Sequence, residues 1–436
     1  MSSPRRVVVV GHGVAGLTAA GAARAQDPEA EIVLLGDEPY DAYYRPRLSH
    51  DLATGIDAAK IRLRPEGWYK KQQIDVRRGR AQAIDPRART VSWSPVGPDE
   101  GGDGDVLSYD SCVLATGSRC NRPPLEGGSR PGVFTLRSAG DAAAIRKRAT
   151  EVEKAAVAGG GLLGLETAHG LVKVVGPGRV CVLERGPWLL RRQLDQEGGE
   201  LLARALTRVG IEILTEAEVA SVAGRTDGEG PDRDDLPLAQ INLKDGRRIG
   251  CGLLVFAAGV RPRVDLAQAA GLAVERRGVV VDDRMQTSDP AIYACGDVAL
   301  HHSGNYAIWP QAMAQGRIAG GNAAGGAQEY SPVVPQTLLE VAGTSVFAVG
   351  EAGAADEARP GELIEVGRGD RAECRYAKFR LRDGRLAGAM LIGQADLAKL
   401  AKAAVEKGLD LTAVAAAPAA ERFDLIIGEL ERQGNQ

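Results

Sequence analysis

The chain has 436 residues, which is more than one hydrophobic core usually holds, so two or three domains are expected. Its net charge of −3 and its aromatic content of only 4% argue against a bulk attraction to nucleic acid or anionic membranes and against a base-stacking surface. No apolar run approaches the ~20 residues of a membrane span, so a cytoplasmic protein is expected.

The chain opens with a predicted dinucleotide-binding unit. The apolar run Val7–Val10 predicts a buried strand, and Gly11-His-Gly13-Val-Ala-Gly16 and an alanine-rich helix follow it. Glycines at this spacing permit a tight turn and a close approach of the backbone to a pyrophosphate at the helix N-terminus. An acid that binds ribose hydroxyls is expected about 20 residues later. The predicted ligands are Gly11, Gly13, Val14, Ala15, Gly16 and Asp37, with Glu38 as the second candidate acid.

The next predicted elements are short strands at 74–76, 81–84 and 90–93 and a buried strand at 111–115. A second, complete fingerprint then follows the apolar run Ala155–Ala158. Its predicted ligands are Gly159, Gly161, Leu162, Leu163, Gly164 and the acid Glu184. A carboxylate at this position favours NADH, because it repels the 2′-phosphate of NADPH. Arg185 keeps NADP open as the less favoured alternative, since a neighbouring arginine can accommodate that phosphate.

Further strands are predicted at 253–258, 279–281 and from Ile292, before a helix at 311–324. The last hundred residues predict strands at 346–349, 376–381 and 386–392 and then a helix rich in alanine and lysine. Two complete fingerprints predict an α/β fold with two Rossmann-like domains, one for each of two dinucleotides.

Several motifs together resemble the FAD- and NAD(P)H-dependent pyridine nucleotide-disulfide oxidoreductases. They are the two glycine loops, Ala115-Thr-Gly117, Ala258-Gly-Val-Arg-Pro262 and Cys295-Gly-Asp297. Within this family, the segments 43–49 and 383–393 are similar to those of rubredoxin reductases and of the N-terminal half of NADH-dependent nitrite reductases. The resemblance implies an FAD domain at 1–122 and 253–330, an NAD domain at 123–252 and a small α+β C-terminal domain at 331–436.

The resemblance also implies roles for single residues. Glu166 is expected beside the nicotinamide carboxamide, and Asp297 with Gly296 is expected to hold the ribityl chain and phosphate of FAD. Arg45 and Arg119 are expected to stabilise a flavin anion or to hold phosphate. Glu166 and Arg45 are therefore the predicted catalytic residues. The other predicted cofactor-binding residues are Ser49, Ala81, Ala115, Thr116, Gly117, Gly259 and Trp309.

Two departures from the family concern the group beside the flavin. The disulfide members carry cysteine after the first acidic strand, but residues 40–55 contain none. Ferredoxin-type reductases usually place a lysine where this chain has His50. The six cysteines form no Cys-x-x-Cys pair, and His301-His302 has no nearby acid in the sequence, so we interpret these histidines as surface residues and expect no metal site.

We therefore expect an NAD(P)H:acceptor oxidoreductase that passes electrons from NADH through FAD to a small redox carrier, either rubredoxin or an iron–sulfur protein such as a ferredoxin. NADH is expected to place its C4 hydride against flavin N5, without a protein nucleophile. Three alternatives remain open: an NADH oxidase, a reductase component of nitrite or nitrate reduction, and an NADH-responsive redox-sensing binding protein. A monomer or a homodimer is expected, with no nucleic acid or membrane as partner.

Overall fold

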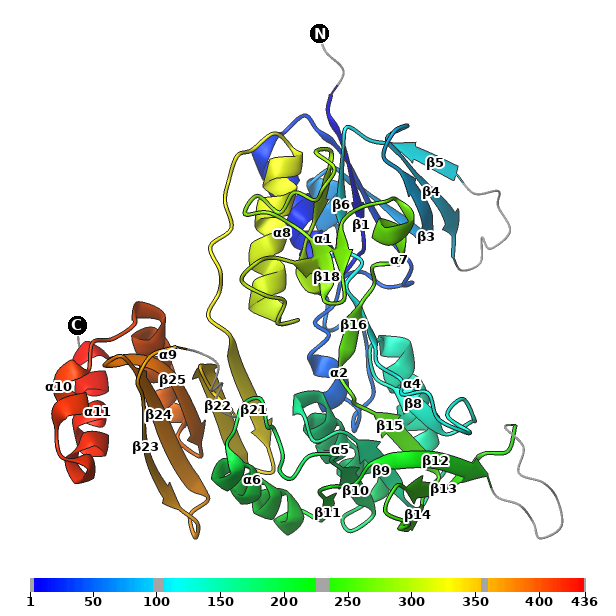
Figure 1. Cartoon of the computed structure of the whole chain (residues 1–436). Coiled ribbons are helices and arrows are strands. Elements are labelled where there is room, and N and C mark those ends of the chain that lie inside the picture. Colours follow the sequence, from blue (N-terminus) through cyan, green and yellow to red (C-terminus); the bar gives the residue numbers. More distant parts are fainter. Residues whose placement is uncertain (1–3, 97–104, 225–234, 354–359, 435–436) are drawn as a thin grey trace. The chain divides into compact units, whose positions relative to one another are not determined.

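The computed structural model describes residues 4–96, 105–224, 235–353 and 360–434, and the chain divides into two compact units (Figure 1). The first unit consists of Met1–Arg47, Asp57–Cys120 and Val260–Val333, and the second of Leu48–Ile56, Asn121–Gly259 and Val334–Gln436. The domain limits given above stay a prediction. Among the described residues, no helix is both long enough and apolar enough to cross a membrane.

A seven-stranded sheet forms the centre of the first unit, with the strand order β19-β6-β1-β2-β3-β4-β5. Strand β1 (Arg6–Val10) runs parallel to both neighbours, β6 (Ser111–Leu114) and β2 (Glu31–Gly36). The outer strands are β19 (Ile292–Ala294), β3 (Ile74–Asp85), β4 (Thr90–Pro95) and β5 (Asp105–Ser108), of which β4 and β5 pair antiparallel. The central strands are apolar and buried, as is usual for parallel strands covered on both faces.

The prediction of separate strands at 74–76 and 81–84 was wrong, because β3 is continuous. Gly79 lies between the two predicted segments but inside the strand, where a Cβ would be 2.2 Å from the ring of Trp93 on β4. A glycine is needed there because the tryptophan packs directly over the backbone.

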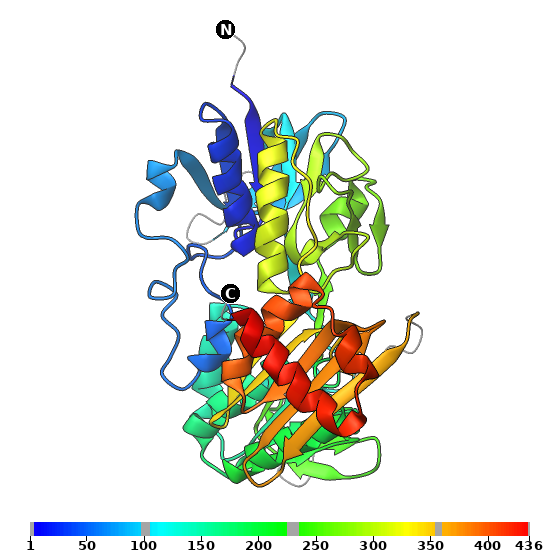
Figure 2. The same ribbon diagram turned by 90° about the vertical axis from the view of Figure 1, so that its left-hand side faces the viewer.

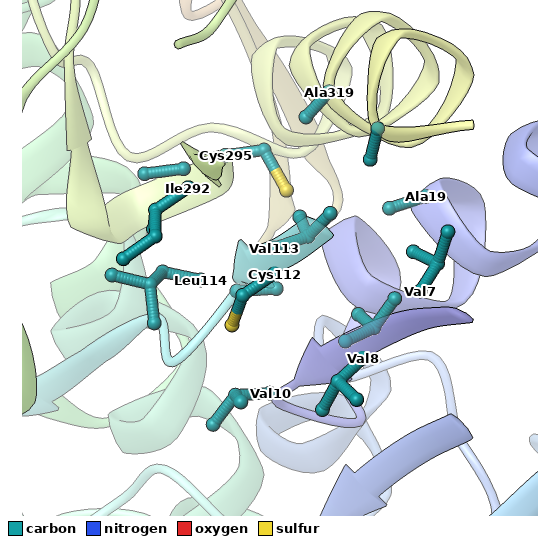
Figure 3. Packing of buried hydrophobic residues seen from close by; sticks show 14 of the residues in the cluster. Val7, Val8, Val10, Ala19, Cys112, Val113, Leu114, Ile292, Cys295 and Ala319 are labelled. Carbon is teal, nitrogen blue, oxygen red and sulfur yellow. The ribbon is translucent and has the colours of Figure 1, made fainter. Parts of the chain in front are cut away.

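Helices α1 (Val14–Gln26) and α8 (Trp309–Ala323) pack against this sheet and against each other. Their backbones approach closely at glycines of α8: a Cβ on Gly320 would lie 2.0 Å from the carbonyl oxygen of Ala19. Figure 3 shows Ala19 and Ala319 of these helices beside the buried side chains of β1, β6 and β19. Helix α8 begins two residues before its predicted start, because Pro310 is favourable in the first helical turn.

Smaller elements complete the first unit. Strands β7 and β16 pair antiparallel, and β18 runs between β17 and β20, parallel to β20. These elements are β7 (Ser118–Cys120), β16 (Val260–Pro262), β17 (Val274–Glu275), β18 (Gly278–Val280), β20 (Ala299–Leu300), α3 (Trp68–Lys71), α7 (Asp265–Ala269) and the 3₁₀ turn η1 (Gly296–Val298). Helix α2 (Arg47–His50) begins in this unit, and its residues 48–50 belong to the second.

The second unit contains a five-stranded parallel sheet with the order β11-β10-β9-β15-β8. Its strands are β8 (Val133–Thr135), β9 (Ala155–Ala158), β10 (Val180–Leu183), β11 (Ile211–Leu214) and β15 (Leu253–Phe256). The connecting helices are α4 (Ala139–Ala149), α5 (Leu162–Val175) and α6 (Gln196–Arg208). A separate antiparallel sheet is formed by β12 (Val219–Gly224), β13 (Leu238–Leu243) and β14 (Arg248–Gly250).

The C-terminal part of the second unit is an antiparallel sheet with the order β21-β22-β25-β24-β23. The strands are β21 (Gln336–Val341), β22 (Thr344–Gly350), β23 (Leu363–Asp370), β24 (Arg375–Arg382) and β25 (Arg385–Ile392). Helices α9 (Ala395–Lys407), α10 (Thr412–Ala416) and α11 (Ala419–Gly434) follow, and Figure 2 shows the red helix α11 lying across this sheet. Two parallel sheets with crossover helices and a C-terminal α+β region confirm the predicted fold class.

Candidate functional site

The first glycine loop joins β1 to α1, and its three glycines have different surroundings. Gly11 has φ +119°, and a Cβ on it would lie 2.1 Å from the carbonyl oxygen of Ala115. A Cβ on Gly16 would lie 1.8 Å from the carbonyl oxygen of Gly11. Around Gly13, in contrast, no protein atom lies within 4 Å of a Cβ position. The outer glycines are therefore needed for packing, while the middle one leaves open space for a ligand.

The second glycine loop, between β9 and α5, repeats this arrangement. Gly159 has φ +127° and a Cβ on it would lie 2.5 Å from the carbonyl oxygen of Ala257, whereas one on Gly164 would lie 1.9 Å from that of Gly159. The space around Gly161 is again open to 4 Å. Two loops that are distant in sequence thus have the same pattern of one open and two packed glycines.

Both following helices begin without a side-chain cap. Gly13 and Gly161 are the N-cap residues of α1 and α5, no side chain bonds to either helix end, and neither first turn contains an acid. The first N–H groups of a helix have no intrahelical acceptor, and the helix dipole favours an anion there. The residues present therefore fit one pyrophosphate at each loop, which is the predicted role of Val14, Ala15, Leu162 and Leu163.

Glu184 lies directly beside the second loop. Its two carboxylate oxygens accept hydrogen bonds from the backbone N–H groups of Gly160 and Gly186, both at 2.6 Å. These bonds fix the carboxylate at the end of β10, where the fingerprint places the ribose of the nucleotide. Arg185, the residue that kept NADP open, is exposed.

The two acids after β2 differ in their contacts. Glu38 accepts a hydrogen bond from the Tyr43 hydroxyl at 2.6 Å and forms an ion pair with Arg45. Asp37 lies 3.3 Å from Arg80 and 3.8 Å from Arg263. Since Glu38 is occupied by two partners from its own segment, Asp37 remains the preferred candidate for a ribose ligand. Arg45, predicted to act on the flavin, is thereby held by a counter-ion of its own.

The turn at Gly296 and Asp297 presents polar groups of the first unit. Asp297 accepts a hydrogen bond from the Ser118 hydroxyl at 2.7 Å, and the N–H of Gly296 donates to Gln315 Oε1 at 2.9 Å. The Nε2 atom of the fully buried Gln315 has no hydrogen-bond partner among the described residues. A buried donor without an acceptor is costly, so this amide fits a site that a bound cofactor completes. Gln315 is not among the cofactor-binding residues predicted from the sequence.

The remaining predicted ligands of the first unit are held by other contacts. The Thr116 hydroxyl donates to the carbonyl of Arg263, and Arg119 lies 3.2 Å from Asp265. Trp309 packs edge-on against Tyr44 with ring centroids 4.8 Å apart. The other positions in the first unit are Ala81 in β3, Ala115 after β6, and Gly117 with φ of +67°. Gly259, with φ of +82°, belongs to the second unit. Their roles toward FAD stay predictions.

Three side chains of the second unit meet at α5. The Ser49 hydroxyl donates to Glu166 Oε2 at 2.7 Å, and His50 Nε2 lies 3.4 Å from Glu166 Oε1. The Glu166 side chain is 16% exposed, and its burial raises its pKa, although the contacts to Ser49 and His50 oppose the shift. The structure thus shows a hydrogen bond between Ser49 and Glu166, which were predicted as separate ligands. It also places His50, which stands where ferredoxin-type reductases carry lysine, beside the same carboxylate. Their part in nicotinamide binding stays a prediction.

The segment that carries Ser49 and His50 is anchored on the helices of the second unit. Ser49 itself is buried, and a Cβ on Gly170 of α5 would lie 2.7 Å from its carbonyl oxygen. Arg146 of α4 donates to the carbonyl of Leu52 at 2.8 Å. This anchoring fixes the hydroxyl that bonds to Glu166.

The ring of His12 has a role that the sequence did not indicate. Arg78 donates to Nδ1 at 2.6 Å, so Nε2 carries the proton and donates to the Tyr69 hydroxyl at 2.8 Å. Burial, with Arg78 second, lowers the pKa of His12 to about 3, so the imidazole stays neutral. The side chain therefore fastens the first glycine loop to β3 and α3. No local signal could have revealed this, since both partners lie far along the chain.

The interpretation of His301 and His302 as surface residues is confirmed for His302, whose side chain is 72% exposed, and was wrong for His301. The expectation that no acid lies near them was also wrong. His301 is 1% exposed, and its Nε2 lies 2.8 Å from Asp283 Oδ1. His302 Nδ1 lies 3.5 Å from the same oxygen. The acid is distant in sequence, and strand pairing brings it to the histidines.

All six cysteines are free thiols. Burial raises the pKa of Cys112, Cys181, Cys251 and Cys295 to about 12. Figure 3 shows Cys112 and Cys295 among the apolar side chains of β6 and β19. Such thiols are inert, because the thiolate is the reactive form.

Comparisons with known proteins identify the family of this chain. The sequence model described as pyridine nucleotide-disulphide oxidoreductase matches residues 5–316. The chain belongs to this family. A second model, described as the rubredoxin NAD+ reductase C-terminal domain, matches residues 335–409. The predictions of an oxidoreductase and of FAD and a nicotinamide nucleotide as cofactors are thereby confirmed.

Three known proteins illustrate what this chain is similar to. An NADH-rubredoxin oxidoreductase of Clostridium acetobutylicum is 29% identical over 92% of this chain and 94% of its own length. An assimilatory nitrate reductase electron transfer subunit of Bacillus subtilis is 32% identical over 89% of this chain, which spans only 48% of that relative. The solved covalent putidaredoxin reductase–putidaredoxin complex matches with a TM-score of 0.80 and 27% identity over 97% of this chain and 99% of the other.

Glu184→Ala should narrow the preference of this flavoprotein for NADH over NADPH. The change removes a carboxylate that is positioned to accept ribose hydroxyls and to repel a 2′-phosphate. Losing one hydrogen bond to a charged group is worth roughly 1.5–3 kcal/mol, or about one to two powers of ten in kcat/KM. Stopped-flow flavin reduction with both nucleotides measures the ratio, and a wild type that prefers NADPH would reverse the cofactor assignment.

Proposed function

We propose that this flavoprotein passes electrons from NADH, through FAD, to a small redox carrier, either rubredoxin or an iron–sulfur protein of the ferredoxin type. The observation that carries the proposal is the pair of open glycines, Gly13 and Gly161, each at the start of an uncapped helix. One loop fits the pyrophosphate of FAD and the other that of NADH, where Glu184 is fixed beside it. Bound FAD supplies the chemistry of accepting a hydride and releasing single electrons.

The protein's own residues would bind and orient the two cofactors. Asp37 and Glu184 would hold the riboses, Asp297 the polar chain of FAD, and Glu166 with Ser49 the nicotinamide carboxamide. None of these groups needs to act as a nucleophile. The free thiols are also not needed, because residues 40–55 contain no cysteine to form the family's redox disulfide.

A carrier protein as acceptor is supported from two sides. The C-terminal region matches a domain described from rubredoxin reductases, and one relative is named as an NADH-rubredoxin oxidoreductase. One of the solved structures that match this chain is the covalent complex of putidaredoxin reductase with putidaredoxin. The B. subtilis relative, named as an electron transfer subunit of nitrate reductase, keeps a component of nitrate or nitrite reduction as the second candidate. A cytoplasmic location fits the free thiols, since the cytoplasm keeps cysteines reduced.

Steady-state assays of the FAD-loaded chain with NADH test the acceptor. We expect reduction of rubredoxin or of a [2Fe–2S] ferredoxin at least about tenfold faster per enzyme than consumption of oxygen. Oxygen consumption that equals or exceeds carrier reduction would make the chain an NADH oxidase instead. Reduction that stops after one turnover, leaving long-lived reduced flavin with every acceptor, would favour the redox sensor.

Two cysteine variants serve as matched controls in this assay. Cys120→Ser and Cys374→Ser remove the two thiols that are only partly buried, and both should keep wild-type carrier reduction within a few-fold. A variant that retains FAD and NADH-dependent flavin reduction but loses turnover would reveal a thiol relay and would contradict direct transfer from the flavin.

A further inference from the structure

A cluster of polar side chains in the first unit has no part in the proposed cofactor sites. Asp283, His301 and His302 place one carboxylate oxygen and two imidazole nitrogens within 4.8 Å of one another. The parallel pairing of β18 and β20 explains how they meet, since Val280 lies opposite Leu300 in this register. Both strands therefore end at the same edge, where the chain continues to Asp283 on one side and to His301 on the other.

The spacing of these atoms is that of a metal site. Asp283 Oδ1 lies 2.8 Å from His301 Nε2 and 3.5 Å from His302 Nδ1. Zinc bonds to nitrogen and oxygen ligands at about 2.0–2.2 Å, and a tetrahedral arrangement then separates neighbouring ligand atoms by roughly 3.3 Å. These two distances lie on either side of this value, and the two imidazole nitrogens lie within 4.8 Å of each other. Side-chain rotations would therefore bring the three atoms onto one ion.

The surroundings hold the inner ligands in place. The His301 ring is fully buried and packs edge-on against Tyr330, whose backbone N–H donates to the carbonyl of Asp283 at 2.7 Å. On the far side of the ring, Nδ1 lies 2.7 Å from the Ser303 hydroxyl. The backbone N–H of Ser303 also donates to Nδ1 at 3.2 Å, so this N–H must turn away when a metal binds Nε2. Nδ1 then carries the ring proton and donates it to the Ser303 hydroxyl, as metal-binding histidines usually do to an outer acceptor.

The outer ligands leave the site open to solvent. The side chains of Asp283 and His302 are 56% and 72% exposed. Three protein ligands with a water-accessible fourth position are typical of open zinc sites, and closed structural sites have four protein ligands. Imidazole nitrogens select zinc and its transition-metal neighbours over magnesium and calcium, which prefer oxygen. We propose that Asp283, His301 and His302 form a zinc-binding site whose fourth ligand is water.

Metal binding changes where the ring proton of His301 lies, and it involves a loop that contacts the turn at Gly296 and Asp297. When the metal binds Nε2 of the neutral His301 ring, the proton that Nε2 shared with Asp283 is transferred to Nδ1, so the ring keeps one proton and stays neutral. The loop that begins at His301 continues to Asn305, whose side-chain amide donates to the carbonyl of Asp297 at 2.8 Å. Zinc should therefore raise the melting temperature of the FAD-loaded protein by mass action and slow the release of FAD.

Isothermal titration of untagged, FAD-loaded protein with Zn²⁺ tests the site. We expect one saturable site per chain, no saturable binding of Mg²⁺, and at least about tenfold weaker zinc binding in His302→Ala and in Asp283→Asn. Both altered side chains are exposed, so these variants should fold. His169→Gln, on α5 in the second unit, is the matched control and should bind zinc like the wild type.

X-ray absorption at the zinc edge identifies the ligands. A shell of nitrogen and oxygen at about 2.0–2.2 Å without sulfur is expected. A sulfur shell would assign the metal to cysteines. Equal affinities of wild type, His302→Ala and Asp283→Asn, or no saturable binding at all, would show that the His301–Asp283 contact is only a hydrogen bond that closes the loop, and the proposal would be wrong.

Discussion

Gly13→Val should yield a folded protein that no longer holds FAD. A Cβ at this position has no packing neighbour within 4 Å, so the substitution should not disturb the fold. The valine side chain instead enters the space that the pyrophosphate needs. We expect FAD affinity to fall at least about 100-fold, equivalent to ~2.7 kcal/mol, and the purified protein to be colourless. Flavin content per chain and circular dichroism measure binding and folding separately.

Substitutions at two other glycines serve as controls for the folding and flavin content of Gly13→Val. Gly16→Ala places a Cβ 1.8 Å from the carbonyl oxygen of Gly11, so it should impair folding itself and lower the yield of protein. Gly428→Val lies in α11, where the space around a Cβ is also open, and it should change neither folding nor flavin content. Full flavin occupancy in a folded Gly13→Val protein would exclude the first loop as the FAD site.

Gly161→Val should produce the complementary defect, a yellow protein that NADH cannot reduce. The second loop has the same open middle glycine, so the valine blocks the nucleotide pyrophosphate while the first loop remains intact. The rate of flavin bleaching by NADH should fall at least about 100-fold, with FAD content unchanged. Dithionite reduces flavin without a bound nucleotide, and it should bleach variant and wild type alike. A normal rate of flavin reduction by NADH in this variant would exclude the second loop as the NADH site.

The parts of the site that sequence predicted are those encoded within short segments. Each glycine loop, its strand and its helix lie within about 30 residues, and the acid follows at a fixed distance. The structure consequently repeats at Gly161 what it shows at Gly13. The strand pattern divided β3 around Gly79, where the reason for a glycine is a tryptophan on another strand. It also missed strands such as β21 and β23.

Contacts between distant segments could not be predicted in the same way. Ser49 donates a hydrogen bond to Glu166, and Arg78 donates one to His12. No local sequence spacing relates the residues of either pair. The acid beside His301 is another example, because only the pairing of β18 with β20 brings Asp283 there. Sequence motifs therefore located the cofactor loops, whereas the groups that support them depend on tertiary packing.

The burial of four cysteines should determine which sulfur atoms of the protein are oxidised over time. With a pKa of about 12, as for Cys112 and Cys295, only about one such thiol in a hundred thousand is ionised at pH 7. Peroxide attacks the ionised, accessible form on the way to sulfenic and sulfinic acids. A reduced flavoprotein that leaks electrons to oxygen generates peroxide in its own vicinity, and the sulfur atoms in its core are shielded from that by-product. Slow oxidative ageing should therefore begin at the partly exposed Cys120 and Cys374 and spare the interior.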